Sequence, residues 1–233
     1  MKHAAMKFAP SLMCMNFLEM EEQLQVMDTC VDLYHVDIMD GHYCKNITLS
    51  PDMIATFRKV TSLPIDCHLM TTDPGDWIEA VAKAGATYIS PHAETINTNA
   101  YRTLHWIESL GCKKGVVLNP ATPLSYVESY LNQIDLLTLM TVDVGFAGQP
   151  FVEEVLTKIE LAKKWREERG YHYEIQIDGS CNTKTYARLE KAGADILVMG
   201  SSGLFGLDSD IRKALGRMYE DYALCTGRRC EDE

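Results

Sequence analysis

The sequence predicts an α/β protein that folds as a single (β/α)8 barrel, the TIM-barrel architecture. Its 233 residues suit one barrel domain, which takes about 200–250 residues. Short apolar runs alternate with amphipathic segments from end to end, as repeated β-α units do. Polar residues follow most of these runs, and no G-x-G-x-x-G precedes the first helical segment. A closed barrel is therefore favoured over an open doubly wound sheet.

Eight apolar runs are expected to form the strands of the barrel. They are short and bounded by turn residues, as buried parallel strands are. In chain order they are residues 7–12, 33–39, 64–70, 88–91, 115–118, 136–142, 173–177 and 196–199. We expect one catalytic domain over residues 1–233, with frayed polar tails at residues 1–6 and about 226–233.

Helical segments lie between the expected strands, and the first is expected at residues 16–30. The pairs Ser50-Pro51 and Asp73-Pro74 are expected to begin helices, with proline at the first helical position. Gly85 and Gly193, each within Ala-Gly-Ala, are expected to end helices in the left-handed conformation.

Composition excludes several classes of function. The chain has 22 Lys and Arg against 33 Asp and Glu, a formal net charge of -11, so it lacks the basic surface that non-specific nucleic-acid binding requires. No uninterrupted apolar stretch approaches the length of a membrane helix. The eight cysteines are scattered without a C-x-x-C pair, which favours free thiols in a reducing compartment. We expect a cytoplasmic protein that binds neither nucleic acid nor membrane.

Four ionisable residues are expected to meet at the mouth of the barrel. Because strand side chains alternate between faces, His35 and Asp37 share the inward face, and His68 lies on the next strand. Asp178 ends the seventh strand region. A single strand histidine is commonly an ordinary core residue, but two imidazoles and two carboxylates at strand ends suit a divalent metal ion. The sequence therefore predicts a metal site.

Glycine-rich segments follow the last three strands, at residues 142–149, 178–180 and 200–205. Glycine lets backbone N–H groups approach a phosphate closely, and barrels often hold phosphate in the loops after strands seven and eight. A phosphorylated substrate is therefore expected. Methionines at the mouth either fill gaps in the core or form an apolar collar that keeps water from a reactive intermediate. They are Met13, Met39, Met70 and Met140.

Together these segments resemble the ribulose-phosphate 3-epimerase family over essentially the whole chain. The matching segments are Ser11, His35-Val-Asp37-Ile-Met39-Asp-Gly, Asp66-Cys-His68-Leu-Met70, Met140-Thr-Val, Gly145-Phe-Ala-Gly-Gln149, Asp178-Gly179 and Gly200-Ser201. The resemblance implies a barrel of the ribulose-phosphate-binding type that inverts C3 of a ketose phosphate. It also implies a homo-oligomer, a dimer or a hexamer.

The resemblance assigns a role to each matching residue. His35, Asp37, His68 and Asp178 correspond to the ligands of one divalent metal ion (Zn, Mn, Co, Fe or Mg), and Asp37 and Asp178 to the acid/base pair. The expected substrate contacts are Ser11, His68, Met39, Met70 and Met140. The expected phosphate contacts are Gly145, Phe146, Ala147, Gly148, Gly179, Ser180, Gly200, Ser201 and Ser202.

Departures from the family pattern bear on the sugar. Tyr43-Cys44-Lys45-Asn46 stands where Phe-Val-Pro-Asn is usual, and Ser180 replaces a second glycine. The segments Ser11-Leu-Met-Cys-Met-Asn16, Asp178-Gly-Ser-Cys-Asn182 and Ser202-Gly-Leu-Phe205 are similar to the D-allulose-6-phosphate 3-epimerase branch. We therefore expect conversion of D-allulose 6-phosphate to D-fructose 6-phosphate, with D-ribulose 5-phosphate and D-xylulose 5-phosphate as the alternative pair.

Inversion at C3 requires a base on one face of a planar enediolate and an acid on the other. Asp37 and Asp178 lie on distant strands and can take these positions, while a divalent cation stabilises the negative charge. A Schiff-base aldolase would need a lysine at a strand end, but Lys7, Lys113 and Lys114 lie at strand starts. The D-x-K-x-x-D motif of related decarboxylases is absent. A non-catalytic phosphosugar-binding protein remains the alternative from another class.

Overall fold

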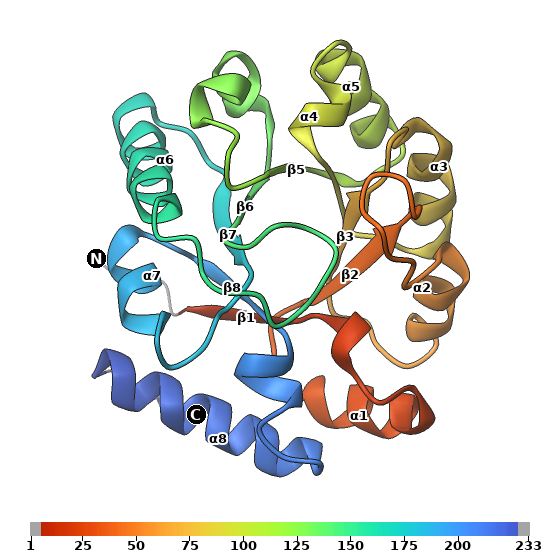
Figure 1. Ribbon diagram of the computed structural model, residues 1–233. Coiled ribbons are helices and arrows are strands. Elements are labelled where there is room, and N and C mark those ends of the chain that lie inside the picture. The colour runs from red at the N-terminus through yellow and green to blue at the C-terminus, as the bar shows by residue number, and fades with distance from the viewer. Residues whose placement is uncertain (1–5, 228–233) are drawn as a thin grey trace.

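The computed structural model describes residues 6–227, which form a ring of eight parallel strands with helices outside it (Figure 1). The strands pair in the order β1-β8-β7-β6-β5-β4-β3-β2. A parallel bridge between Ser11 and His35 links the first two strands, so the ring is nearly closed and the predicted (β/α)8 TIM barrel is confirmed. The strands are β1 (Lys7–Pro10), β2 (Tyr34–Met39), β3 (Ile65–Met70), β4 (Tyr88–Pro91), β5 (Lys113–Leu118), β6 (Leu136–Met140), β7 (Glu174–Asp178) and β8 (Ile196–Met199).

Helices cover the outside of the ring (Figure 1). The α-helices are α1 (Met20–Met27), α2 (Pro51–Phe57), α3 (Gly75–Ala84), α4 (Ala93–Ile96), α5 (Ala100–Ser109), α6 (Val155–Arg169), α7 (Tyr186–Ala192) and α8 (Ile211–Thr226). Tighter or wider helical segments are η1 (Leu12–Cys14), η2 (Phe17–Glu19), η3 (Leu124–Gln133) and η4 (Ser201–Phe205), the last of which is a π-helix.

Helix boundaries follow the predicted signals with two differences. Ser50 is the N-cap of α2, and Gly85 and Gly193 end α3 and α7 at φ +109° and +112°. The predicted helix at residues 16–30 is divided, because the Asn16 side chain accepts a hydrogen bond from the Leu18 N–H and begins the short η2. Helix α3 starts at Gly75, one residue later than predicted. The Asp73 side chain accepts the N–H of Gly75, which places the proline at the N-cap.

Side-chain alternation on β2 separates the core from the mouth of the barrel. Tyr34, Val36 and Ile38 belong to the main core with residues of the surrounding helices. Met39 belongs instead to a small cluster with Met70. The register of β2 and β3 pairs residue 37 with residue 68 and residue 39 with residue 70. The predicted ligands on these two strands therefore lie side by side.

Several other expectations concern the whole chain. Seven of the cysteines lie within residues 6–227 and all seven are free, while Cys230 lies outside the described residues. In the same part of the chain, no helix is both long and apolar enough to cross a membrane. Of the predicted tails, only Met6, Thr226 and Gly227 are described, and Gly227 is the C-cap of α8. The rest lies outside the described residues.

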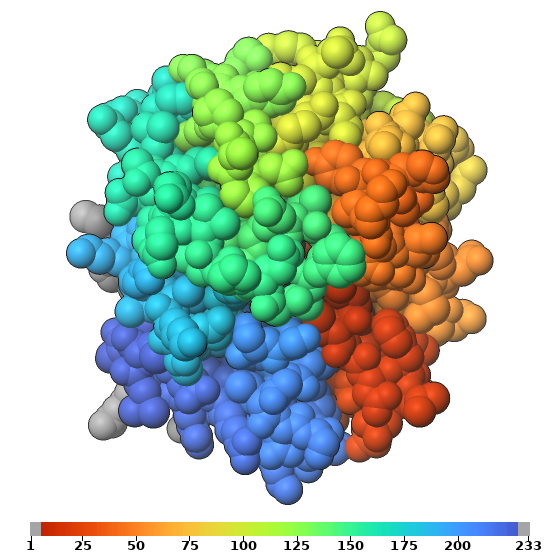
Figure 2. Space-filling view, in the orientation of Figure 1, coloured from red at the N-terminus to blue at the C-terminus, as the bar shows by residue number. Residues whose placement is uncertain are grey.

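The loop between β6 and α6 lies across the open end of the barrel (Figure 1). In the space-filling view its green atoms cover much of the centre of that face (Figure 2). The Asn46 side chain, from the segment after β2, donates a hydrogen bond to the Gly145 carbonyl at 2.8 Å and holds the loop there.

Candidate active site

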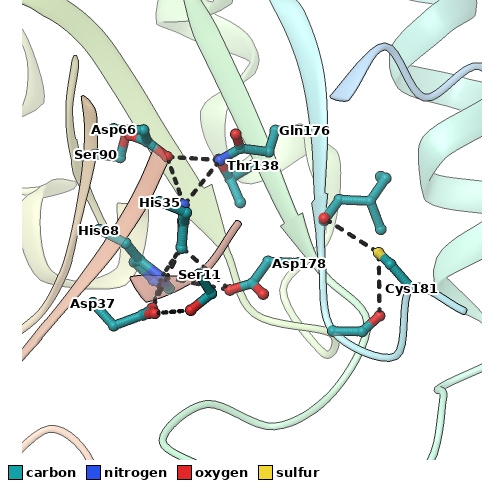
Figure 3. A network of polar contacts seen from close by, with 12 residues as sticks. Ser11, His35, Asp37, Asp66, His68, Ser90, Thr138, Gln176, Asp178 and Cys181 are labelled. Atoms are coloured by element: carbon teal, nitrogen blue, oxygen red, sulfur yellow. Dashed lines mark hydrogen bonds and ion pairs between the residues drawn. The ribbon is translucent and has the colours of Figure 1, made fainter. Parts of the chain in front are cut away.

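Four side chains converge where β2, β3 and β7 reach the mouth of the barrel (Figure 3). Nε2 of His35 lies 3.3 Å from Nδ1 of His68 and 3.3 Å from Oδ1 of Asp37. Nδ1 of His68 lies 3.2 Å from the same Asp37 oxygen, and Oδ2 of Asp178 lies 3.6 Å from both imidazole nitrogens. Ligand atoms at about 2.0–2.2 Å from a tetrahedral zinc ion would be about 3.3–3.6 Å apart. The donor set and its spacing therefore fit a divalent cation.

The charges of the cluster favour ionised carboxylates. Burial opposes ionisation of Asp37, but His35 and His68 beside it outweigh burial and lower the pKa of that carboxyl group. The same balance lowers the pKa of Asp178, against burial and the nearby Asp37 charge. The carboxylates in turn raise the pKa of His35 and His68, although burial alone would lower it. A bound divalent cation would replace the imidazolium charge, so that both carboxylates stay ionised while the imidazoles are neutral ligands.

His35 is oriented from behind by a buried polar network (Figure 3). Its Nδ1 lies 2.9 Å from Oδ2 of Asp66, which also accepts the Gln176 side-chain amide at 2.7 Å. The other Asp66 oxygen accepts the Ser90 hydroxyl at 2.5 Å, and Gln176 donates to Thr138 at 3.0 Å. Such hydrogen bonds to the far nitrogen of a ligating histidine fix its tautomer and ring orientation.

Sequence reasoning did not assign these supporting residues, although a signal was available for two of them. Asp66 precedes His68 by two positions and Gln176 precedes Asp178 by two, so each shares the inward face with a predicted ligand. His92, after β4, is a third residue that was missed, and its Nε2 lies 2.8 Å from Nε2 of His68. No motif in the sequence marks it.

A pocket opens above the cluster, and the remaining predicted residues line it. It is open to solvent, and its space with the open part included is about 590 Å³. The predicted residues in its lining are Ser11, Asp37, Met39, Met70, Met140, Gly145, Phe146, Ala147, Gly148, Asp178, Gly179, Ser180, Gly200, Ser201 and Ser202. His35 and His68 lie fully buried beside it. Lining residues that were not predicted as contacts include Cys14, Val142, Asp143, Cys181 and Val198.

The glycine-rich loops reach the pocket through backbone conformations that side chains resist. Gly179 has φ +117°, and a Cβ atom there would lie 2.7 Å from the Val142 side chain. Gly145 has φ +108°, and a Cβ atom there would lie 2.8 Å from Cβ of Cys44. Ser180 has φ +49°, a left-handed conformation that is uncommon for a residue with a side chain. These loops bring backbone groups and three serines to one side of the pocket, which suits an anionic group.

Residues 7–205 match the ribulose-phosphate 3 epimerase family. The chain belongs to the ribulose-phosphate 3-epimerase family. It is 40% identical over 214 residues to ribulose-phosphate 3-epimerase of Bacillus subtilis, covering 91% of this chain and 97% of that protein. It is also 40% identical over 200 residues to the chloroplastic ribulose-5-phosphate-3-epimerase of Arabidopsis thaliana, covering 85% of this chain and 71% of that protein. The prediction of an isomerase, an epimerase acting on a sugar phosphate, is thereby confirmed.

Solved structures agree on the fold. The 3-hexulose-6-phosphate synthase of Salmonella typhimurium superposes with a TM-score of 0.69 at 15% identity, over 94% of this chain and 100% of that one. Membership of the ribulose-phosphate 3-epimerase family does not distinguish the D-allulose-6-phosphate branch, because the relatives are named for ribulose phosphate. The finer expectation about the sugar is therefore not supported by these similarities.

Proposed function

We propose that this member of the family is a metal-dependent 3-epimerase that interconverts D-ribulose 5-phosphate and D-xylulose 5-phosphate. The observation that carries the proposal is the pair of carboxylates, Asp37 and Asp178, which belong to a cation-fitting cluster and line a pocket with glycine-rich walls. The names of the relatives support the pentulose phosphate. D-ribulose 5-phosphate, the alternative substrate in the sequence analysis, therefore becomes the main proposal, and D-allulose 6-phosphate becomes the alternative.

His35, Asp37, His68 and Asp178 would hold the divalent cation. When bound, it would act as a Lewis acid that polarises the carbonyl group of the substrate next to C3. The chain itself supplies the orientation of these ligands. The Ser11 hydroxyl donates to Oδ2 of Asp37 at 2.7 Å, which leaves Oδ1 facing the two imidazoles.

Proton transfer is assigned to the two aspartates. Asp37 comes from β2 and Asp178 from β7, strands that are separated in the ring by β1 and β8. One carboxylate would remove the C3 proton from one face of the substrate, and the other, carrying a proton, would deliver it to the opposite face. Their roles exchange when the reaction runs in reverse. Met39, Met70 and Met140 in the pocket lining would exclude water from the carbanionic intermediate.

Phosphate is assigned to the glycine-rich side of the pocket. Gly145, Gly179, Gly200 and Ser201 lie in its lining, and their backbone groups are the donors expected to hold the dianion. The chain as a whole carries a net charge of -11, so a local device of this kind is needed to bind an anionic substrate.

Asp37→Asn and Asp178→Asn test the two-base scheme. Each should lower turnover of D-ribulose 5-phosphate by at least about 10²-fold, because removal of a general acid or base costs that much. Each variant should also slow deuterium incorporation at C3 from heavy water, while circular dichroism shows a folded barrel. Asp76→Asn, an exposed position on α3, is the matched control and should exchange normally. Wild-type exchange rates in both active-site variants would refute the scheme.

The choice of sugar needs a direct comparison. We expect a higher kcat/KM for D-ribulose 5-phosphate than for D-allulose 6-phosphate, and loss of both activities on treatment with a chelator. The opposite ranking would make D-allulose 6-phosphate the main substrate. Tight binding of both sugars without turnover would favour a phosphosugar-binding protein. We further propose that the enzyme is a cytoplasmic homo-oligomer, which size-exclusion chromatography with light scattering would test.

A further inference from the structure

A second imidazole and a carboxylate extend in a row behind the predicted ligand His68. Nε2 of His68 lies 2.8 Å from Nε2 of His92, and Nδ1 of His92 lies 3.3 Å from Oε2 of Glu94. Both imidazoles are fully buried, so no bulk water can take the place of either contact. The row connects Glu94 to His68 through His92, the residue that follows β4.

The number of protons in this row is fixed by the carboxylate at its end. An ionised carboxylate only accepts hydrogen bonds, so Nδ1 of His92 must carry the proton that is donated to Glu94. Neutral His92 then has a lone pair on Nε2, which can only accept. Nε2 of His68 must therefore carry the proton between the two rings. When a bound cation makes His68 neutral, the lone pair is then on Nδ1, the nitrogen that faces Asp37 and Asp178.

Glu94 is held in position by its other oxygen. Oε1 accepts the Asn119 backbone N–H at 3.1 Å and the Thr122 hydroxyl. The Asn119 side chain donates to the Tyr43 hydroxyl at 2.7 Å, and the Tyr43 ring packs on the His92 ring with centroids 4.8 Å apart. Burial would raise the pKa of Glu94, but the hydrogen bonds with His92 and Thr122 outweigh it and lower this pKa to about 2, so Glu94 is ionised and directed at His92.

We propose that Glu94, acting through His92, is a positioning residue that selects the tautomer of His68 with a free Nδ1 lone pair, the form required of a metal ligand. The inference rests on the proposed cation site and adds a determinant of its affinity outside the four ligands. Asp66 does the same for His35 in one step, whereas His68 is served by a relay of two residues.

Glu94→Gln keeps the shape of the side chain but removes the charge that fixes which groups donate and which accept in the row of hydrogen bonds. A glutamine amide can accept from His92 or donate to it, so the opposite arrangement becomes possible, in which the proton of His68 moves to Nδ1 and blocks the cation. We expect the dissociation constant of the metal-free protein for Zn²⁺ to rise about 10- to 100-fold, the usual effect of losing such a partner. Glu108→Gln, the same change at an exposed position on α5, should leave the constant unchanged.

Two substitutions of His92 separate the hydrogen bond from packing. In His92→Gln the amide oxygen can accept from His68 while the amide nitrogen donates to Glu94, so zinc affinity should stay within a few-fold of the wild type. His92→Leu fills the space but accepts nothing, and it should lose affinity as Glu94→Gln does. Equal losses in the two His92 variants would overturn the relay in favour of a packing role.

The tautomers can be read directly in the wild-type protein. With ¹⁵N-labelled histidine and a chelator present, long-range ¹H–¹⁵N spectra should show His92 protonated at Nδ1 and not at Nε2, and His68 protonated at Nε2 whether or not its Nδ1 also carries a proton. The opposite tautomers would overturn the inference whether or not any variant folds. A wild-type protein that binds no Zn²⁺ in competition with a chromophoric chelator would overturn the proposed cation site, and with it this role. Binding that is unchanged in Glu94→Gln would overturn the relay alone.

Discussion

Asp66 offers a quantitative test of how the network behind the site is built. It is fully buried and accepts three hydrogen bonds, from His35 at 2.9 Å, Gln176 at 2.7 Å and Ser90 at 2.5 Å. In Asp66→Asn the new amide nitrogen is tolerated best at the oxygen that faces Ser90, because the serine hydroxyl can rotate to accept. The other oxygen then keeps both of its donors but loses its charge.

The expected cost follows from this count. A hydrogen bond that is accepted by a neutral amide oxygen instead of a carboxylate is weaker by about 1 kcal/mol. Two such replacements should therefore lower the free energy of unfolding by about 2 kcal/mol. Asp66→Leu removes every acceptor and leaves three buried donors unpaired, at roughly 1–3 kcal/mol each, for a total of about 5 kcal/mol. Leucine should therefore cost at least twice as much as asparagine.

Urea unfolding in the presence of a chelator measures both values without a contribution from bound cation. Asp76→Asn, which is exposed, should change stability by no more than about 0.5 kcal/mol. An Asp66→Asn variant as stable as this control, or a leucine variant as stable as the asparagine variant, would refute the assigned network.

Three other predictions concern the pocket and the metal. Gly179→Ala should lower the free energy of unfolding by about 2–4 kcal/mol, because the residue has φ +117° and the new Cβ atom would contact Val142. Gly111→Ala, also at positive φ but with open space around it, should lower it by less. Equal losses in the two variants would contradict the contact with Val142. Burial raises the pKa of Cys181, so the unfolded state loses its thiol proton above about pH 9 while the folded state keeps it, and stability should fall by up to about 1.4 kcal/mol per pH unit. Between pH 8 and 10 the denaturation midpoint of Cys181→Ala should fall less steeply with pH than that of the wild type. Parallel curves for the two proteins would contradict a contribution from the Cys181 thiol. Added Mn²⁺ should raise Tm over that in EDTA, and Asp178→Asn should abolish the rise; equal Tm values for the wild type in both buffers would exclude a cation at this site.

The sequence alone determined the barrel fold and which side chains of its second and third strands face inward. Both depend on local rules, since the period of apolar runs fixes the elements and alternation by two fixes the face on which His35, Asp37 and His68 lie. The glycine segments also follow a local rule, because the freedom to take the positive φ seen at Gly145 and Gly179 is a property of glycine itself. These features need no knowledge of what lies across the ring.

Only the tertiary structure decided which groups touch. Gln176 reaches Asp66 although 110 positions separate them, because β7 and β3 face each other across the closed ring. His92 meets His68 only because β3 and β4 pair with residue 68 opposite residue 90. A local pattern carries no information about partners on other strands, because the distances between side chains of different strands are set by the register of the strands and by the closure of the barrel. The cluster of His35, Asp37, His68 and Asp178 could therefore be predicted from the sequence, whereas the contacts of the residues that orient it could not.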